Sequence, residues 1–422
     1  MSGAQAIPGA GRRFDVLIVG AGHAGVHVAA TLAASFEGSI GLLSAESCEP
    51  YEKPPLTKGF LAGEVTEHEL LLKPSTFWQS SGVTLLLHQE VATVDAEEHA
   101  VVTAKGDRFT YGSLVWAAGA DPMRIGLPAK ELPGVHELRT LEDTVRFRDE
   151  VTSGTRVVVV GGGYIGLEAA SACVKLGADV TIVESLSRLL SRVTGPEVAE
   201  YLLRRHLESG ARVELDASVV GIGETDGRAS SVRLGDGREL AADVVLVSVG
   251  IQPTVGVLAQ AGARCSNGVE VDRQGRTSLP GVYAAGDCTC FPVDGGGFLR
   301  LESLQNAVEQ GEVVAQTIKG EEAAYVVVPY FWSNQYDIKI KTIGLFAGYD
   351  ETIVRQGANP DSFSVIYLRQ GRVCAVDSIN AMKDYVDARR VLGARVGVDV
   401  VQDPALRLRD AILEEHAGVG SP

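Results

Sequence analysis

Two glycine-rich loops of the same design constrain the fold of this chain more than any other feature. The first, GAGHAG at residues 20–25, follows an apolar run at residues 14–19, and the second, GGGYIG at residues 161–166, follows a valine run at residues 157–160. After each loop the sequence predicts a helix and then a second strand, which is typical of a parallel α/β sheet. The chain therefore carries two strand–loop–helix–strand units.

The composition indicates a globular protein with more than one core. With 422 residues, of which 45% are hydrophobic and 22% charged, we expect two or three domains. No apolar run reaches the roughly 18 residues that a membrane-spanning helix needs. Residues 1–13 lack the apolar segment of a signal peptide, so we expect a disordered leader and a cytoplasmic location.

Charge and cysteine content argue against several functions. A net charge of −16 disfavours a nucleic-acid surface. Six cysteines are too few for a disulfide framework, and Cys288 and Cys290 form a CxC without the second pair that a zinc site needs. We therefore predict structural cysteines and no metal site.

The segments after the two units predict further strands. Residues 83–122 and 211–253 each have the pattern of antiparallel strands, and each ends in an apolar strand followed by Gly and then Pro. Pro329 marks another boundary, because the sequence beyond it predicts hairpins and then a terminal helix without a phosphate-binding loop.

The three glycines of a GxGxxG loop have separate tasks. The first makes a tight turn, the second lets the backbone approach a pyrophosphate, and the third lets the helix pack closely on the strand. The phosphates then lie at a helix N-terminus, which favours anions. The glycines that fit are Gly20, Gly22 and Gly25 in the first loop and Gly161, Gly163 and Gly166 in the second. Two dinucleotides are therefore predicted, the alternative being that one loop is a structural relic.

An acidic residue near the end of the second strand of each unit indicates which nucleotide binds. Glu184 is placed to accept hydrogen bonds from an adenosine ribose, where it would repel a 2′-phosphate, so the second loop should prefer NADH to NADPH. Arg188 lies close enough in sequence to soften that preference. Glu46 can have the same ribose role in the first unit.

A further signal for FAD lies downstream, in TSLPGVYAAGD at residues 277–287. Asp287 ends an apolar strand, where its carboxylate can bond a ribityl hydroxyl, the alternative being a helix cap or a turn aspartate. A helix predicted to begin near Glu302 would direct its N-terminus at the pyrimidine edge of the flavin and favour negative charge there.

These residues carry a family resemblance that covers residues 15 to about 392. The motifs are VGAGHAG, PYEKPPLTKGFLAG (50–63), WAAGADP (116–122), GGGYIGLEAA, YAAGD, RLESLQNA (300–307) and YFWSNQ (330–335). The chain resembles the FAD-dependent, NADH-using ferredoxin or rubredoxin reductases of the glutathione-reductase-like superfamily, and among these the putidaredoxin-reductase type.

The resemblance implies an α/β fold with two Rossmann-like dinucleotide-binding domains, for FAD and NADH, and an α+β C-terminal domain. The implied FAD domain is discontinuous, with residues 1–118 and 251–328, and the NADH domain spans residues 119–250. Residues 329–422 form the implied C-terminal domain, which closes the flavin site and helps to dock the acceptor. The reaction would be hydride transfer from NADH to FAD, followed by release of single electrons.

The resemblance also implies roles for individual side chains. Lys58 falls where the family places a lysine beside flavin N5, and Glu168 where it places the partner of that lysine. Tyr164 would lie over the flavin ring, and Trp332, with Gln335, would reach its pyrimidine side. The alternatives are that Lys58 is a solvated surface lysine, that Tyr164 packs under the second sheet and that Trp332 is a core residue. Two positions depart from the family: Lys53, where an arginine near the FAD is frequent, and Thr254, where asparagine is common.

The implied electron acceptor is a [2Fe-2S] ferredoxin or a rubredoxin, which would serve a cytochrome P450 or a Rieske-type oxygenase. Because small ferredoxins are usually acidic, a chain of net charge −16 must gather local positive charge to steer one. The candidates are Lys58, Arg300, Lys339, Lys341, Arg369, Arg372, Lys383, Arg389 and Arg390.

Two other functions fit the same scaffold. A disulfide, coenzyme-A-disulfide or peroxide reductase would need a redox cysteine near the flavin, for which Cys48 is the candidate. A non-enzymatic flavoprotein that senses NADH is the other.

Overall fold

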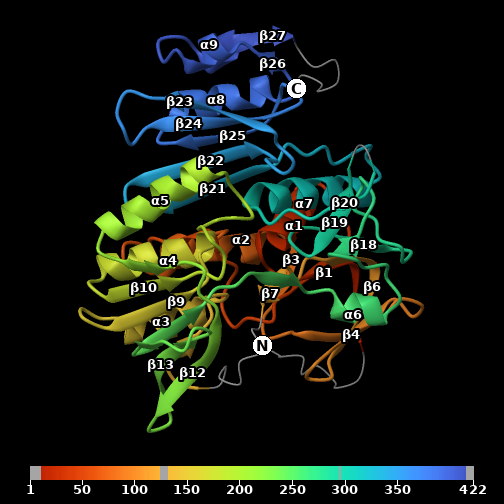
Figure 1. Cartoon of the computed structure of the whole chain (residues 1–422). Helices are drawn as coiled ribbons and strands as arrows, with labels where there is room; N and C mark the ends of the chain where they lie inside the picture. The colour runs from red at the N-terminus through yellow and green to blue at the C-terminus, as the bar shows by residue number, and fades with distance from the viewer. Residues whose placement is uncertain (1–10, 124–131, 294–295, 415–422) are drawn as a thin grey trace. The chain divides into compact units, whose positions relative to one another are not determined.

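The computed structural model describes residues 11–123, 132–293 and 296–414 (Figure 1). The chain divides into two compact units. The first unit contains Met1–Lys53, Glu67–Asp121 and Ile251–Val327. The second contains Pro54–Thr66, Pro122–Gly250 and Val328–Pro422.

A sheet with strand order β3-β2-β1-β6-β5-β4 forms the centre of the first unit, and β18 pairs with β6. β1, β2, β3, β6 and β18 are parallel, whereas β4 and β5 form an antiparallel extension. Helices α1 and α7 pack against each other, and buried residues such as Leu17 and Ile18 in β1 form the core. The elements are β1 (Arg12–Val19), α1 (His23–Ala33), β2 (Ile40–Leu43), η2 (Glu67–Leu70), α2 (Ser75–Ser80), β3 (Val83–Leu86), β4 (Val91–Asp95), β5 (Ala100–Thr103), β6 (Arg108–Trp116), β7 (Ala120–Pro122), β16 (Ile251–Pro253), α6 (Gly256–Gln260), β17 (Val269–Glu270), β18 (Val282–Ala284), β19 (Thr289–Pro292), β20 (Phe298–Leu299) and α7 (Leu304–Ile318).

The second unit contains a parallel sheet of order β11-β10-β9-β15-β8. Its central strand β9 is a run of buried valines, as expected for a strand covered on both faces. β12, β13 and β14 form a separate antiparallel sheet, which lies in the sequence between β11 and β15 of the parallel sheet. The elements are η1 (Pro54–Thr57), β8 (Val135–His136), α3 (Leu141–Glu150), β9 (Arg156–Val160), α4 (Tyr164–Lys175), β10 (Asp179–Val183), α5 (Pro196–Glu208), β11 (Arg212–Glu214), β12 (Val219–Thr225), β13 (Arg228–Leu234), β14 (Glu239–Ala241) and β15 (Val244–Val247).

The C-terminal part of the second unit is an antiparallel sheet of order β21-β22-β25-β24-β23 with helix α8, drawn in blue in Figure 1. Beyond α8 the chain continues through short elements, so the prediction that the helix is terminal was wrong. The elements are β21 (Tyr330–Gln335), β22 (Ile338–Gly344), β23 (Glu351–Gln356), β24 (Phe363–Arg369), β25 (Arg372–Ile379), α8 (Met382–Val391), β26 (Arg395–Val396), α9 (Val398–Gln402), η3 (Leu408–Ala411) and β27 (Ile412–Glu414).

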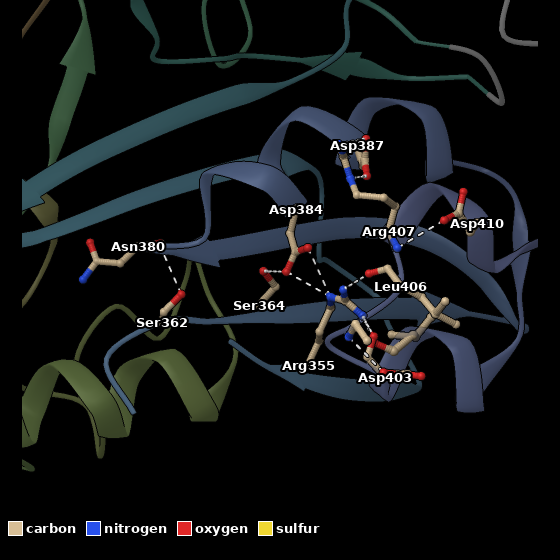
Figure 2. A network of polar contacts seen from close by, with 12 residues as sticks. Arg355, Ser362, Ser364, Asn380, Asp384, Asp387, Asp403, Leu406, Arg407 and Asp410 are labelled. Carbon is tan, nitrogen blue, oxygen red and sulfur yellow. Dashed lines mark hydrogen bonds and ion pairs between the residues drawn. The ribbon is translucent and has the colours of Figure 1, made fainter. Parts of the chain in front are cut away.

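The buried side chain of Arg355 holds these short elements to the sheet (Figure 2). Its guanidinium donates to both carboxylate oxygens of Asp384 at 3.1 Å and to the main-chain oxygens of Val401, Asp403 and Leu406 at 2.5–2.7 Å. A single side chain therefore ties three carbonyl groups of the irregular C-terminal backbone to strand β23.

The prediction that residues 83–122 and 211–253 are antiparallel throughout was wrong at both ends of each segment. In the first segment β3 pairs in parallel with β2, and β6 pairs in parallel with β1. In the second segment β11 pairs in parallel with β10, and β15 pairs in parallel with β9. The cause is that such a strand of a Rossmann-like sheet alternates apolar and polar residues in the same way as a hairpin strand. The sequence pattern therefore does not show whether the strand pairs in parallel or antiparallel. Among the residues that the structure describes, no helix is long and apolar enough to cross a membrane, and no cluster of His, Cys, Asp or Glu could hold a metal ion.

Candidate active site

The first glycine loop connects β1 to α1 and has the geometry that a pyrophosphate requires. Gly20 has φ +102°, and a Cβ built on it would lie 2.2 Å from the carbonyl oxygen of Ala117. A Cβ on Gly25 would lie 1.9 Å from the oxygen of Gly20. A Cβ on Gly22, the N-cap of α1, would meet no atom within 4 Å. The turn and the helix packing therefore exclude side chains, while the middle glycine leaves room at the helix N-terminus for an anion.

The second loop, between β9 and α4, repeats this geometry. Gly161 has φ +115°, and its Cβ would lie 2.1 Å from the oxygen of Ser248. A Cβ on Gly166 would lie 2.2 Å from the oxygen of Gly161, and one on Gly163 would meet no atom within 4 Å. Since both loops keep all three features, neither has the form of a structural relic.

The acidic residue of the second loop is held in place by the loop itself. Glu184 Oε2 accepts from the N–H of Gly162 at 2.8 Å, and Oε1 accepts from the N–H of Leu186 at the same distance. The guanidinium of Arg188 donates to the main-chain oxygens of Thr194 and Ser191 at 2.7 and 3.1 Å. Arg188 is therefore engaged by its own loop.

The acidic residue of the first unit has a different set of partners. Glu46 accepts from the hydroxyl of Tyr51 at 2.6 Å and from Lys53 Nζ at 2.8 Å. Lys53 thus keeps its positive charge beside the carboxylate, on a partly buried surface. Beside them, burial and the charge of Lys53 lower the pKa of His23 to about 4, so the first residue of α1 is neutral at pH 7.

Asp287 lies in a turn directly after β18, preceded by Gly286 with φ +85°. The predicted helix that follows begins at Leu304, where Ser303 is the N-cap and accepts from the N–H of Asn306. Asp287 therefore does not cap this helix.

A buried ion pair joins Lys58, directly after η1, to helix α4 within the second unit. Lys58 Nζ lies 2.6 Å from Glu168 Oε2, and it also donates to the main-chain oxygen of Pro54 at 3.0 Å. The Lys58 side chain is 15% exposed and that of Glu168 only 3%. Lys58 is therefore not the solvated surface lysine that was the alternative. A buried ion pair contributes little to stability on balance, which favours a functional reason for its presence.

Two further donors hold the Glu168 carboxylate, and sequence reasoning missed both. Thr57 Oγ1 donates to Oε2 and Ser333 Oγ donates to Oε1, each at 2.6 Å. Thr57 precedes Lys58 in the chain, but Ser333 comes from β21. Its position beside Trp332 in the motif YFWSNQ was the only signal that could have indicated it.

Aromatic side chains lie beside this pair. Lys58 Nζ lies 4.8 Å from the ring centroid of Trp332, within the range of a cation–π contact. The Tyr164 ring is 4.4 Å from that of Phe331 at an angle of 32°, and burial together with the nearby Asp377 raises the pKa of the Tyr164 hydroxyl. Lys58, Glu168, Tyr164 and Trp332 thus belong to one unit, whereas the first glycine loop, Glu46, Lys53 and Asp287 belong to the other.

Comparison with known proteins identifies the family of this arrangement. Residues 14–311 match the family described as pyridine nucleotide-disulphide oxidoreductase, and residues 330–412 match that described as reductase C-terminal. The chain belongs to the pyridine nucleotide-disulphide oxidoreductase family. This family uses FAD and NAD(P)H, and the resemblance to its ferredoxin reductases is confirmed.

Relatives of the oxidoreductase match it over nearly its whole length. It is 44% identical over 403 residues to the 5,5′-dehydrodivanillate O-demethylase ferredoxin reductase subunit of Sphingobium sp., covering 94% of this chain and 98% of that one. It is 43% identical over 404 residues to a ferredoxin–NAD(P)+ reductase of Sphingomonas sp., covering 94% and 97%. The solved covalent complex of putidaredoxin reductase with putidaredoxin contains a similar chain, with 32% identity, a TM-score of 0.90 and coverage of 95% and 98%. The predicted α/β fold with a C-terminal reductase domain is thereby confirmed.

The cysteines of the oxidoreductase do not favour the disulfide-reductase alternative. All six are unpaired. Burial, and after it the charge of Glu46, raises the pKa of the Cys48 thiol, whereas a redox nucleophile needs a lowered one. The ferredoxin reductase function fits the relatives, and the alternative does not.

Thr254, where the sequence departs from the family pattern, retains polar contacts. Its main-chain oxygen accepts from Trp116 Nε1 at 2.8 Å, and its hydroxyl donates to Asp121 at 3.1 Å. The loop after residue 250 is therefore held without the usual asparagine.

The basic residues predicted to dock an acceptor differ in their surroundings. Lys339 and Lys341 line a surface cavity of about 320 Å³ with Asn380 and Tyr385, and Lys341 Nζ lies 4.3 Å from the Tyr385 ring. Arg300 pairs with Glu302 and Arg372 with Glu414, and the guanidinium of Arg369 bonds the oxygen of Ala347; Lys383, Arg389 and Arg390 are exposed on α8.

Proposed function

We propose that this chain is an FAD-containing reductase that takes hydride from NADH and passes electrons one at a time to a small iron–sulfur protein that serves an oxygenase. The observation that carries the proposal is the match over at least 94% of the chain to relatives named as ferredoxin reductases. Other relatives are a rubredoxin-NAD(+) reductase and the reductase component of a p-cumate 2,3-dioxygenase system.

The two glycine loops divide the nucleotides between them. The first loop holds the FAD pyrophosphate, with Glu46 at a ribose and Asp287 at the ribityl chain. The second loop holds the pyrophosphate of NADH, with Glu184 at the adenosine ribose. The proposal that NADH is preferred to NADPH is supported by the hydrogen bonds that fix Glu184 and by those that engage Arg188 elsewhere.

FAD, when bound, accepts a hydride and releases electrons singly. The protein contributes position and charge. We propose that Lys58, held by Glu168, keeps a positive charge beside flavin N5, and that Trp332, whose ring centroid lies 4.8 Å from Lys58 Nζ, reaches the pyrimidine side of the flavin. Tyr164 covers the flavin ring and moves aside for nicotinamide.

The domain assignment and the location remain part of the proposal. Residues 1–118 and 251–328 bind FAD, residues 119–250 bind NADH, and residues 329–422 dock the acceptor. We place the protein in the cytoplasm, where NADH and a ferredoxin are both available.

The stoichiometry of the reaction tests this function. One NADH carries two electrons and one proton beyond NAD+, so each NADH should reduce two one-electron ferredoxins and release one proton. Under anaerobic conditions we expect a ratio of two ferredoxins per NADH. NADH oxidation that leaves every iron–sulfur protein tested oxidised would contradict the proposal.

A further inference from the structure

A row of buried polar side chains runs from Glu168 to helix α5 within the second unit. Ser333 Oγ donates to Glu168 Oε1 at 2.6 Å, and Gln335 Nε2 donates to Ser333 Oγ at 3.2 Å. Gln335 Oε1 lies 3.0 Å from His206 Nε2, and the Tyr336 hydroxyl lies 2.9 Å from His206 Nδ1. Ser333 and His206 are 0% exposed and Gln335 is 1% exposed, so these side chains are shielded from bulk solvent.

The chemistry of these groups fixes the direction of every hydrogen bond in the row. An ionised carboxylate only accepts, so the Ser333 hydroxyl donates to it and accepts from the Gln335 amide. The carbonyl oxygen of Gln335 accepts, so His206 carries its proton on Nε2, and its Nδ1 accepts from Tyr336. All four bonds therefore point toward the carboxylate, an arrangement in which each bond strengthens the next.

The charges in the row support the same direction. Burial lowers the pKa of His206 to about 4, which keeps the imidazole neutral at pH 7, with one donor and one acceptor. The row thus ends at Glu168, whose other carboxylate oxygen lies 2.6 Å from Lys58 Nζ. Serine, glutamine and histidine are costly to bury for packing alone, whereas aliphatic side chains would fill the same space without that cost.

We propose that Ser333, Gln335 and His206 are positioning residues that act through Glu168. They hold its carboxylate in one orientation, and the carboxylate holds the Lys58 side chain in one place. The inference rests on the proposed function, in which the Lys58–Glu168 pair serves hydride transfer to FAD. It makes helix α5 and strand β21 the support of that pair.

Nuclear magnetic resonance of the histidine side chains tests the row without turnover. In the flavin-containing protein labelled with ¹⁵N-histidine, we expect His206 to be the Nε2–H tautomer, its signal being assigned by its loss in His206→Gln. Glu168→Gln and Ser333→Ala should each shift this signal. An Nδ1–H tautomer, or a signal unchanged by both substitutions, would overturn the inference.

Flavin reduction by NADH tests the role of the row. Ser333→Ala removes one of the hydrogen bonds that position the Glu168 carboxylate, so we expect it to slow flavin reduction by NADH roughly tenfold. It should also shift the flavin reduction potential, which a merely structural change would leave in place. Gln335→Leu should act in the same direction by removing the donor behind Ser333.

Ser364→Ala is the matched control. Ser364 is fully buried in the same unit and donates to a carboxylate at 3.0 Å, but that carboxylate belongs to Asp384. We expect this variant to leave the His206 signal, the potential and the reduction rate unchanged. Equal effects of Ser333→Ala and Ser364→Ala would refute a specific role for the row.

The outcomes separate this inference from the proposed function. If NADH reduces the flavin and Ser333→Ala slows that step, but no ferredoxin accepts electrons, the row has its role and the proposed acceptor is wrong. If ferredoxin is reduced normally and Ser333→Ala has no effect on potential or rate, the function holds and the inference fails.

Discussion

Replacing Glu184 by glutamine should change the nucleotide preference of this reductase in a defined direction. A hydrogen bond from a ribose hydroxyl to a charged acceptor contributes about 1.5–3 kcal/mol. Because about 1.4 kcal/mol is a factor of ten, Glu184→Gln should weaken NADH binding roughly 10- to 150-fold. The carboxylate has lone pairs for a ribose in addition to the two main-chain donors that it already accepts from, Gly162 and Leu186.

The same substitution should favour NADPH. A carboxylate about 5 Å from a 2′-phosphate repels one unit of its charge by about 3 kcal/mol at an effective dielectric constant of about 20. Glu184→Gln removes that repulsion while NADH binding weakens. The ratio of the two affinities should therefore change more than either affinity alone.

Anaerobic stopped-flow measurement of flavin reduction at varied NADH and NADPH gives the dissociation constant of each. Arg188→Gln is the control, because the Arg188 guanidinium bonds only main-chain oxygens of its own loop among the contacts described, and it should affect both nucleotides alike. The reasoning is refuted if Glu184→Gln leaves the NADH-to-NADPH ratio unchanged, or if Arg188→Gln is the variant that alters it.

Three further predictions concern the acceptor and stability. Reversing charge at Lys339 and Lys341 should lower kcat/KM for an acidic ferredoxin about tenfold at low salt and flatten its salt dependence; an unchanged salt dependence would exclude these lysines from docking. Arg355→Met breaks a buried ion pair with Asp384 and should lower the free energy of unfolding, measured in urea, by about 3–5 kcal/mol. A decrease of less than about 1 kcal/mol would contradict the role of Arg355 in holding the C-terminal elements to the sheet. The folded pKa of His206 lies below the ordinary 6.5, so the stability due to its neutral ring is present above pH 6.5 and is lost as the pH falls toward 4. This amounts to about 2 kcal/mol between pH 7 and 5, and unfolding of His206→Gln should show a smaller decrease.

The nucleotide loops could be predicted from the sequence because their physics is local. Gly20 and Gly161 adopt positive φ, and Gly25 and Gly166 lie against a carbonyl oxygen only five residues earlier in the chain. Because only glycine meets these requirements, each loop has glycines at a fixed spacing that can be recognised in the sequence. Family motifs then indicated Lys58 and Glu168 as partners, and the structure brings them to 2.6 Å.

The support of that pair could not be predicted in the same way. Glu168 and Ser333 are 165 residues apart in the chain, and His206 and Gln335 are 129 apart. A single serine or histidine has no sequence pattern that reveals a buried partner so distant. The short elements beyond α8 were missed for a similar reason. They are held by Arg355 and by buried residues such as Val401 and Leu408, which pack on distant strands of the sheet without forming a regular sequence pattern.

The most direct test of the central claim is anaerobic mixing of the protein with NADH and then with an oxidised [2Fe-2S] ferredoxin, following flavin and cluster absorbance together. The account predicts that NADH bleaches the flavin and that the cluster bleaches as the flavin colour returns. It is contradicted if the flavin is bleached by NADH, no iron–sulfur protein restores its colour, and a disulfide or peroxide does so through Cys48.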